Sequence, residues 1–242
     1  MKILLIGYGK MGKAIDRLAT QKGHEIVGKI DDTNPDLLQT IDTATVDVAI
    51  EFSRPDAAFH NISTCLKRGI KIISGTTGWL EKYEEIKSLC QANKGTFLYA
   101  SNFSLGVNLF FALNKTLSKL MAGYGQYEPS LVEIHHTQKL DAPSGTAITL
   151  AESIIDNHPE KTKWVNEHSD KQDTITILSE RTDQVPGTHT VSYDSEMDSI
   201  EIRHTAHTRD SFALGAVVVA EWINDKKGWL TMEDFINIKA AF

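Results

Sequence analysis

The sequence predicts an α/β protein in which an N-terminal, Rossmann-like, doubly wound parallel sheet precedes a C-terminal α+β domain. Three observations predict this class. Short apolar runs alternate with helical patterns through residues 1–102, and a glycine-rich turn at Gly7–Gly12 joins the first run to the first helix. After residue 102 the pattern changes to one long helix followed by several β-branched runs.

The N-terminal series begins with a short apolar strand at Lys2–Ile6 and a helix over Met11–Lys22 whose apolar residues share one face. The β-branched run Glu25–Ile30 predicts a second strand. Because strand and helix alternate and the strands are apolar throughout, we expect a parallel sheet with helices on both faces. The series continues with strands at Val46–Phe52, Lys71–Ser74 and Thr96–Ala100 and helices at Ala57–Arg68 and Lys82–Gln91.

The second part of the chain reads as an α+β domain that binds the substrate. We expect helical patterns at Phe212–Asn224 and Leu230–Phe242 to return to the first domain and brace it. The predicted domains are therefore 1–102, completed by 210–242, and 103–209. The elements expected between them are a long helix Leu105–Met121, a strand Ser130–His136, a helix Gly145–Asn157, a polar loop over 158–172, and strands Thr174–Ser179, Gly187–Tyr193 and Ser199–Thr205.

The composition indicates a globular protein with a large core and argues against several other classes of protein. With 242 residues, 41% of them hydrophobic, the chain can bury a large core, and its net charge of −7 argues against nonspecific binding of nucleic acid. Cys65 and Cys90 have no metal-like spacing, so we interpret them as reduced structural thiols. No apolar run is long enough for a signal peptide or a membrane span, so we expect a cytoplasmic location and no membrane partner.

The turn Gly7-Tyr8-Gly9-Lys10-Met11-Gly12 matches the G-x-G-x-x-G fingerprint of dinucleotide sites. Gly7 permits the tight turn, Gly9 lets the backbone approach a pyrophosphate, and Gly12 allows close packing of helix and strand. The N-terminus of the following helix then faces the phosphates. A glycine-rich turn in another kind of α/β protein is the alternative.

Two acids, Asp31 and Asp32, stand at the end of the second predicted strand, about 20 residues beyond the turn, where a carboxylate can accept hydrogen bonds from the adenosine ribose. Carboxylates at this place repel a 2′-phosphate, although Lys10 or Lys29 can partly offset the repulsion. We therefore predict a preference for NADH, with NADPH tolerated.

Two further segments, Gly75-Thr76-Thr77-Gly78 and Ala100-Ser101-Asn102-Phe103, follow the fourth and fifth predicted strands. The carboxyl ends of parallel strands share one edge of a sheet, where a nicotinamide lies in this class of fold. Backbone groups in either segment can hydrogen-bond a carboxamide, and a polar turn without function explains each segment as well.

The segment Glu133–Thr146 contains the groups suited to substrate chemistry. His135 and His136 end a strand and point to opposite faces, so that one can serve as a general acid and the other support it. Lys139 can attract a carboxylate, and Ser144-Gly145-Thr146 opens a helix whose free N–H groups bind anions. A strand–turn–helix with Ser144 as N-cap and with surface histidines remains the alternative.

A second basic cluster, Arg203, His204, His207 and Arg209, is equally explained by a solvated surface strand and receives no role.

Together these motifs resemble the dihydrodipicolinate reductase family, the 4-hydroxy-tetrahydrodipicolinate reductases of bacterial lysine and diaminopimelate synthesis. The segment His-His-x-x-Lys-x-Asp-Ala-Pro-Ser-Gly-Thr is highly specific to that family. The matching segments are Gly7–Gly12, Glu51–Pro55, Gly75–Gly78, Asn102–Ser104, Glu133–Thr146, Gly187–His189, and the stretch from Arg209 through Ala216.

The resemblance implies roles for the site residues. It implies that His135 is the proton donor and Lys139 a second catalytic residue, while His136, Ser144, Gly145 and Thr146 bind the substrate carboxylates. It also implies a homotetramer assembled through the sheets of the substrate domains, NADH or NADPH as cofactor, and no metal. The implied cofactor contacts are Gly7, Tyr8, Gly9, Lys10, Met11, Gly12, Asp31, Phe52, Gly75, Thr76, Thr77, Ala100, Asn102 and Phe103.

Three departures from the family pattern stand out. The glycine turn is one residue shorter than the common G-x-x-G-x-M-G form, and Thr137-Gln138 stands where many members have Arg-His, which removes two positive charges. The segment between Asp32 and Asp47 is short enough for a helix and strand of longer members to be missing.

Two other functions stay open on the residues alone, because a fold never proves an activity. One is another NAD-dependent imine or ketone reductase, such as an amino-acid dehydrogenase. The other is a non-enzymatic redox sensor that binds a dinucleotide, which would not need the His-His-Lys cluster.

Overall fold

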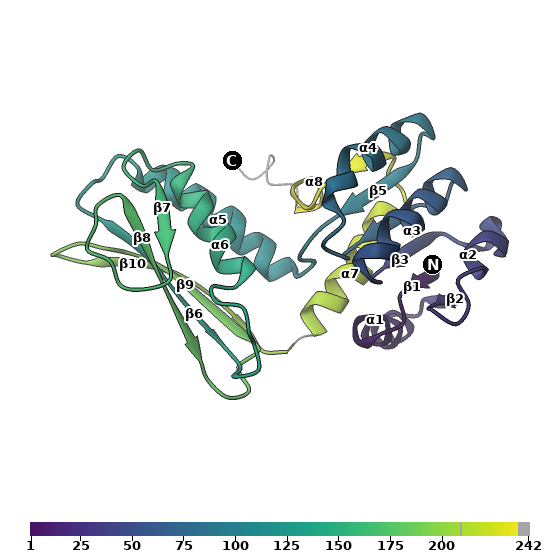
Figure 1. Ribbon diagram of the computed structural model, residues 1–242, viewed down its shortest axis with the longest axis horizontal. Coiled ribbons are helices and arrows are strands. Elements are labelled where there is room, and N and C mark those ends of the chain that lie inside the picture. Colours follow the sequence, from purple (N-terminus) through teal and green to yellow (C-terminus); the bar gives the residue numbers. More distant parts are fainter. Residues whose placement is uncertain (209, 237–242) are drawn as a thin grey trace. The chain divides into compact units, whose positions relative to one another are not determined.

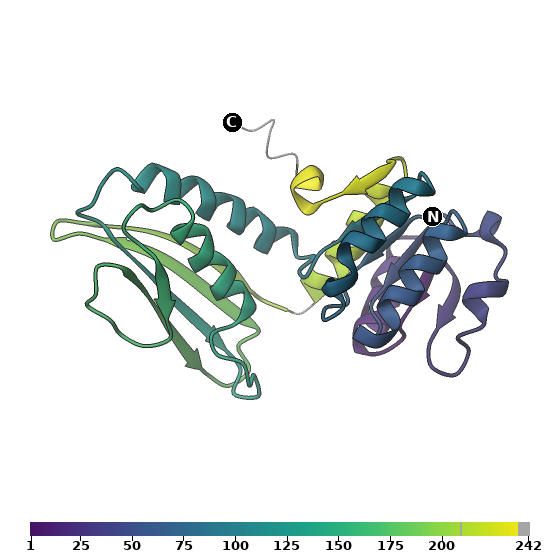
Figure 2. The ribbon, with the colours of Figure 1, turned by 45° about the horizontal axis from the view of Figure 1, so that its top comes forward.

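The computed structural model describes residues 1–208 and 210–236 and divides the chain into two compact units (Figures 1 and 2). Unit 1 contains Met1–Leu105 together with the chain from Asp210 onward, and unit 2 contains Gly106–Arg209.

Unit 1 is built on a six-stranded sheet with the order β11-β5-β4-β3-β1-β2, in which every neighbouring pair is parallel. The predicted parallel, doubly wound class is confirmed. The strands are β1 (Lys2–Ile6), β2 (Glu25–Ile30), β3 (Val48–Glu51), β4 (Ile72–Ser74), β5 (Thr96–Tyr99) and β11 (Gly228–Leu230).

Alternate residues of β1 face two separate cores, which is why the strand reads as an unbroken apolar run. Ile3 and Leu5 are buried among residues of α1 and α7, whereas Leu4 and Ile6 are buried among residues of α3 and α4. The helices therefore cover both faces of the sheet. Their bounds are α1 (Lys10–Gln21), α3 (Pro55–Lys67), α4 (Tyr83–Ala92) and α7 (Asp210–Ile223), with a 3₁₀ turn at Leu80–Lys82 before α4.

The predicted helix over Leu230–Phe242 is wrong at its start. Leu230 ends β11, the edge strand, which pairs with β5, and a short helix α8 follows at Met232–Ile236; residues 237–242 lie outside the described part of the chain. β11 pairs with backbone groups of β5 that would otherwise be unpaired, and the Trp229 ring centroid lies 4.8 Å from that of Tyr83 and 5.0 Å from that of Phe97. Pairing and aromatic packing thus override the local helical pattern.

The short segment after Asp32 forms one-turn structure and no strand. A helix α2 (Leu37–Thr40) is followed by a 3₁₀ turn at Thr43–Thr45. Leu38 anchors this segment, since its side chain is buried in the same core as α3. Arg68 also holds it by donating to the carbonyl oxygens of Leu38 and Ile41.

Unit 2 is a five-stranded mixed sheet with the order β10-β9-β6-β8-β7. Helices α5 (Leu105–Met121) and α6 (Gly145–Ile155) lie on one face of this sheet (Figures 1 and 2). Strand β7 lies inside the predicted polar loop over 158–172, because a three-residue strand that pairs only with β8 leaves no pattern of its own. The strands are β6 (Glu128–His135), β7 (Lys163–Val165), β8 (Thr174–Arg181), β9 (Gly187–Asp194) and β10 (Ser199–Ala206).

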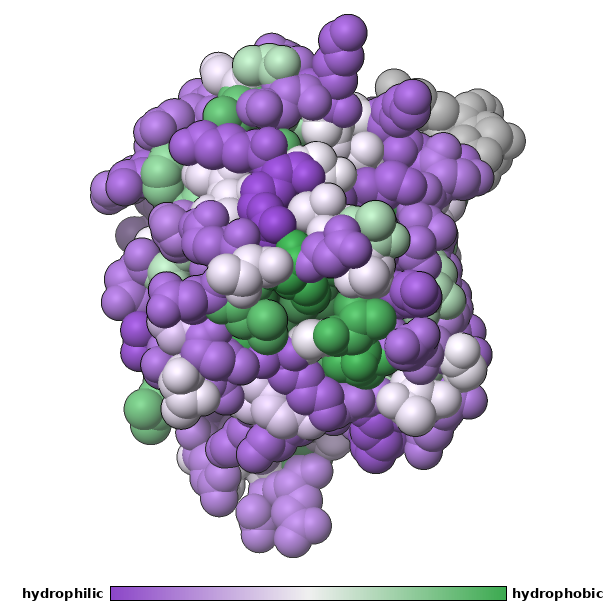
Figure 3. All heavy atoms as spheres, turned by 90° about the vertical axis from the view of Figure 1, so that its right-hand side faces the viewer, coloured by the Kyte–Doolittle hydropathy of each residue, from purple (hydrophilic) through white to green (hydrophobic). Residues whose placement is uncertain are grey.

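Both cysteines are buried free thiols, as the sequence predicts. Burial raises the pKa of the Cys65 thiol and that of Cys90, which keeps both sulfurs protonated and unreactive. Within the described ranges, no helix has the length and apolar character needed to cross a membrane. One face of the molecule is mostly hydrophilic, with a small hydrophobic patch near its centre (Figure 3).

Candidate active site

The glycine turn between β1 and α1 is too tightly packed for side chains at two of its three glycines. Gly7 has a φ of +91°, and a Cβ there would lie 1.9 Å from the carbonyl oxygen of Phe52. A Cβ at Gly12 would lie 2.2 Å from the carbonyl oxygen of Gly7. These clashes match the roles that the fingerprint assigns to its first and last glycines.

Gly9, the N-cap of α1, fits a bound pyrophosphate. Among residues 1–208 and 210–236, no heavy atom beyond the chain neighbours of Gly9 lies within 4 Å of a Cβ built there. The cap has no side-chain hydrogen bond, and the first turn of α1 has no acidic residue. A helix leaves its first N–H groups without helical acceptors, and their partial positive charge attracts anions. The exposed backbone at Gly9 and Lys10 therefore suits the phosphates of a dinucleotide.

Tyr8, Asp16 and Lys29 form a cluster beside this turn. The Tyr8 hydroxyl donates to Asp16 over 2.5 Å, and the Lys29 ammonium lies 2.6 Å from the same carboxylate. The pKa of Lys29 is raised chiefly by its hydrogen bond to Asp16. Lys29 is therefore engaged by Asp16, which weakens its suggested role in offsetting a 2′-phosphate.

Asp31 follows the last residue of β2 and accepts hydrogen bonds from the backbone and hydroxyl of Thr33, and these bonds lower its pKa. Asp32 is exposed and lies 3.0 Å from Arg54. Asp31 thus presents an ionised carboxylate at the carboxyl end of β2, as a ribose contact requires.

The buried carboxylate of Glu51 ties the ends of β3 and β4 together. Glu51 accepts hydrogen bonds from Ser74 over 2.5 Å, from Thr76 over 2.9 Å and from Ser53. The Thr76 hydroxyl also accepts from the Ser53 N–H over 2.8 Å. Gly75-Thr76 is therefore part of a hydrogen-bonded network at the carboxyl edge of the sheet.

Phe52 and Phe103 bring the three strand ends of this edge together. Their ring centroids are 5.6 Å apart, and a Cβ at Gly75 would lie 2.1 Å from the Phe52 ring. Of the other predicted contacts, Thr77 is exposed, Ala100 is buried and Asn102 is half-buried. The candidate nicotinamide contacts thus share one edge of the unit 1 sheet.

In unit 2, a polar row crosses the sheet on the face that carries α6. Glu133 in β6 lies opposite Ser179 in β8 and opposite His189 in β9, and His189 lies opposite His204 in β10. Cross-strand neighbours on one face have Cβ atoms about 5 Å apart, so the register alone places these groups in contact. His135, two residues beyond Glu133, shares their face.

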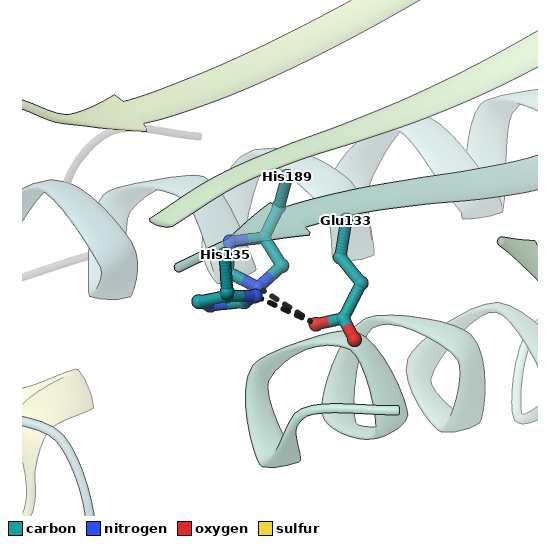
Figure 4. Close-up of side chains that lie close together, drawn as sticks. All are labelled: Glu133, His135 and His189. Carbon is teal, nitrogen blue, oxygen red and sulfur yellow. Dashed lines mark ion pairs between the residues drawn. The ribbon is translucent and has the colours of Figure 1, made fainter. Parts of the chain in front are cut away.

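Glu133 is fully buried, and two histidines face one of its oxygens (Figure 4). Its Oε2 lies 3.2 Å from Nδ1 of His135 and 3.7 Å from Nε2 of His189. The two imidazole rings are 5.0 Å apart and nearly perpendicular. Burial acts to raise the pKa of Glu133, but the close histidines His135 and His189 and the hydrogen bonds from Ser144 and Ser179 outweigh it and hold the pKa far below its usual range.

The other oxygen of Glu133 binds the start of α6. Oε1 accepts from the Ser144 N–H over 3.0 Å, and the Ser144 hydroxyl caps the helix by accepting from Ala147 over 3.2 Å. The N–H groups of Gly145 and Thr146 are left without a helical acceptor, and no described heavy atom lies within 4 Å of a Cβ built at Gly145. The predicted N-cap and anion-ready helix start are thus present together beside His135.

Arg181 holds the turn that follows β6. Its guanidinium lies 3.2 Å from Glu133 and donates over 2.6 Å to the Asp141 carbonyl oxygen. Lys139 pairs with the Asp141 carboxylate over 2.7 Å. The charge of Glu133 is therefore neutralised by Arg181, whereas Lys139 is paired with the exposed carboxylate of Asp141.

The chain matches one family along both units. Residues 1–103 match the family described as dihydrodipicolinate reductase, N-terminus, and residues 106–236 match dihydrodipicolinate reductase, C-terminus. The chain belongs to the dihydrodipicolinate reductase family.

Two curated relatives agree with this family assignment. The chain is 49% identical to a 4-hydroxy-tetrahydrodipicolinate reductase of Christiangramia forsetii over 239 residues, which cover 98% of each chain. It is 33% identical to the enzyme of the same name in Archaeoglobus fulgidus, over 94% of this chain and 96% of the relative.

Among solved structures, the chain resembles a dipicolinate-bound dihydrodipicolinate reductase from Paenisporosarcina sp. TG-14. The TM-score is 0.74 at 25% identity, over 96% of this chain and 97% of that one. The predicted family membership and fold class are therefore confirmed.

The predicted substrate-site residues of this family member lie near the end of β6 and the start of α6. His135 is buried beside Ser144, His136 is half-buried, and Lys139 lies in the adjoining turn; Arg209 lies outside the described residues. The sequence analysis assigned no role to Glu133, Arg181 or His189. Their only signal was position within or near motifs of the family, since their contacts depend on strand register.

Proposed function

We propose that this chain catalyses the NAD(P)H-dependent reduction of 4-hydroxy-tetrahydrodipicolinate to tetrahydrodipicolinate in lysine and diaminopimelate synthesis. The observation that carries the proposal is the buried histidine His135 beside the anion-binding start of α6. A dicarboxylate held at that helix start receives a proton from the adjacent imidazole. The names of the curated relatives and the dipicolinate of the related structure support this substrate class.

The residues of unit 1 fit a dinucleotide cofactor. The open space at Gly9 and the uncapped start of α1 suit the pyrophosphate, Asp31 suits the ribose, and the Phe52 and Thr76 edge suits the nicotinamide. When bound, the reduced nicotinamide supplies the hydride. We also assign Tyr8, Lys10, Met11, Gly75, Thr77, Ala100, Asn102 and Phe103 to the cofactor contacts.

The residues of unit 2 bind the substrate and move one proton. Gly145, Thr146 and the Ser144 hydroxyl hold one carboxylate, while His136 and Lys139 hold the other and orient the ring. His135 gives its proton to the substrate as the substrate is reduced. Loss of water, with addition of one hydride and one proton, balances the conversion; the dehydration step is not assigned to a residue.

We infer a preference for NADH over NADPH. Asp31 is ionised, and Lys29 is already engaged by Asp16 and Tyr8, so a 2′-phosphate meets the negative charge of Asp31 while Lys29 is paired elsewhere. The experiment is the ratio of kcat/KM for the two cofactors. A kcat/KM much higher with NADPH than with NADH contradicts the preference.

The activity itself is tested by following nicotinamide absorbance, with substrate made in situ from pyruvate and aspartate semialdehyde by a purified synthase. Substrate-dependent oxidation supports the proposal. No oxidation with either cofactor, in folded protein that binds NADH, rejects it in favour of another imine or ketone reductase or of a redox sensor. The cytoplasmic location and the homotetramer stay predictions.

A further inference from the structure

We propose that Glu133 is the positioning residue of this site: its carboxylate decides which nitrogen of His135 carries the ring proton and ties that histidine to the anion-binding start of α6. The proposal rests on the proposed function for its catalytic consequence, but the ring-proton assignment can be tested without turnover.

The first step concerns the charge of Glu133. The side chain has no exposed surface, and it accepts from donors in two other segments of unit 2, at Ser144 before α6 and at Ser179 and Arg181 in β8. Its pKa is held far below the usual range by these and the histidine contacts, which outweigh the effect of burial. Glu133 is therefore an ionised carboxylate, which can only accept hydrogen bonds.

The second step concerns the tautomer of His135. Oε2 of Glu133 forms an ion pair with Nδ1 of His135 at 3.2 Å (Figure 4), although neither atom has a partner with hydrogen-bond geometry in the described part of the chain. Nδ1 carries the ring proton, because a lone pair at this distance would be repelled by the negative oxygen. The exchangeable proton of catalysis is then the one on Nε2.

The third step concerns the space beside Nε2. A Cβ built at Gly187 would lie 3.1 Å from Nε2 of His135 and 3.2 Å from its Cδ2. The missing side chain at Gly187 thus leaves room at the nitrogen that exchanges the proton. Glu133 and Gly187 act on opposite sides of one ring.

The fourth step links the histidine to the anion site. Because Oε2 faces His135 and Oε1 binds the Ser144 N–H over 3.0 Å, one rigid carboxylate sets the separation of proton donor and helix start. His189 closes the link, since its Nε2 lies 3.0 Å from the Ser144 hydroxyl and 3.7 Å from Oε2. The pKa of His189 is lowered mainly by burial, so this second ring is neutral near pH 7.

The activity test compares Glu133→Gln with Glu180→Gln, an exposed glutamate on the neighbouring strand β8. The charged and titratable groups around His135 are Glu133, His189, Arg181 and Lys139. Glutamine keeps the size of the side chain but cannot stabilise an imidazolium. We expect kcat to fall about 10–100-fold, with NADH affinity nearly unchanged.

The split between kcat and KM, with rescue by a conservative variant, separates positioning from a merely structural role. Glu133→Gln should lower kcat while the KM for NADH stays near the wild-type value, and Glu133→Asp, which keeps the charge, should restore part of kcat. Glu180→Gln leaves kcat unchanged. Wild-type kcat in folded Glu133→Gln overturns the proposal.

The second test is ¹⁵N NMR of histidine-labelled protein, with His135 assigned by the signals lost in His135→Asn. In the wild type we expect the neutral ring of His135 to carry its proton on Nδ1. In Glu133→Gln we expect the proton on Nε2, because the amide N–H₂ can donate to Nδ1. A wild-type ring protonated on Nε2 rejects the proposal even if Glu133→Gln does not fold.

The two proposals fail differently. If the wild type does not reduce the substrate, the proposed function fails, and the NMR result still decides the role of Glu133. If the wild type turns over but the ring signals are the same in both proteins, only the positioning role fails.

Discussion

At the scale of single residues, the site depends on charges that are balanced in pairs. Glu133 lies against Arg181, and Lys139 lies against Asp141. The first pair is buried at the carboxylate and fixes geometry, whereas Asp141 is largely exposed and can release its lysine at little cost. Only Lys139 is therefore free to exchange its partner for a substrate carboxylate.

Replacing Lys139 with Ala removes this exchangeable charge. We expect kcat to fall about 100-fold or more, while NADH affinity stays nearly intact, because the cofactor contacts belong to unit 1. Steady-state kinetics and NADH titration measure the two effects. Lys163→Ala, which removes a lysine paired with Asp173 in the same unit, is the matched control, and unchanged turnover in Lys139→Ala rules out its role.

The buried His189 makes stability depend on pH. Burial is the main cause that lowers its pKa from the ordinary value of 6.5, so the unfolded chain takes up a proton at a higher pH than the folded chain. The stability that the neutral His189 ring contributes is fully present above pH 6.5. It is lost as the pH falls through the lower pKa of this histidine in the folded state. Burial lowers the pKa values of His158 and His204 too, and they add to this slope.

We therefore expect the melting temperature to fall between about pH 7.5 and pH 5.5. Calorimetry at both values checks this, and His189→Gln should flatten the dependence relative to wild type. The exposed His168 provides the control His168→Gln, which should not change the dependence of the melting temperature on pH. A slope that is identical in His189→Gln and wild type contradicts the assignment.

At the scale of elements, two helix starts offer N–H groups to anions in different ways. The start of α1 is a glycine with no side-chain cap, which leaves its N–H groups for a pyrophosphate. The start of α6 is capped by Ser144, whose hydroxyl accepts from the Ala147 N–H and leaves the N–H groups of Gly145 and Thr146 without a helical acceptor. The cap fits a small carboxylate, which needs fewer donors than a pyrophosphate.

Substitutions at two glycines of the α1 turn should have different effects, one on stability and the other on NADH binding. Gly12→Ala should destabilise the protein by about 1–3 kcal/mol, since the backbone must shift to relieve the added contact. Gly9→Ala should melt like the wild type yet bind NADH more weakly, because its methyl fills the open space at the helix start. Thermal melts and NADH titration check both, with Gly123→Ala as a control in open space. Wild-type NADH affinity in Gly9→Ala would place the pyrophosphate elsewhere.

At the scale of the whole molecule, the unit 2 sheet has one face under helices and another with apolar side chains. Val132 and Ile134 alternate with the core residues of β6, and the neighbouring Leu178 is 41% exposed. Such a face suits association with a second sheet. This supports the homotetramer implied by the family resemblance.

We expect light scattering to give a mass four times that of the 26.9 kDa chain. Leu178→Lys should shift the protein toward smaller assemblies, because a charge is costly in a closed sheet interface. Leu80→Lys, at an equally exposed leucine of unit 1, is the control and should not change the mass. A monomer at working concentration in the wild type contradicts the assembly.

The fold class, the glycine turn and the segment Glu133–Thr146 can all be recognised from the amino-acid sequence alone. These follow from local rules: unbroken apolar strands, glycines at fixed spacing, and a serine at a helix start next to histidines. The predicted bounds of β1, β2 and α5 agree with the structure for the same reason.

Only the tertiary structure decided which groups meet. Glu133, Ser179 and His189 come together through the register of three strands, and register depends on pairing across the sheet rather than on neighbours in the chain. The short edge strands β7 and β11 form because β8 and β5 offer them pairing partners, so their own residues carry no signal. The buried charge that positions His135 was for that reason invisible in the sequence.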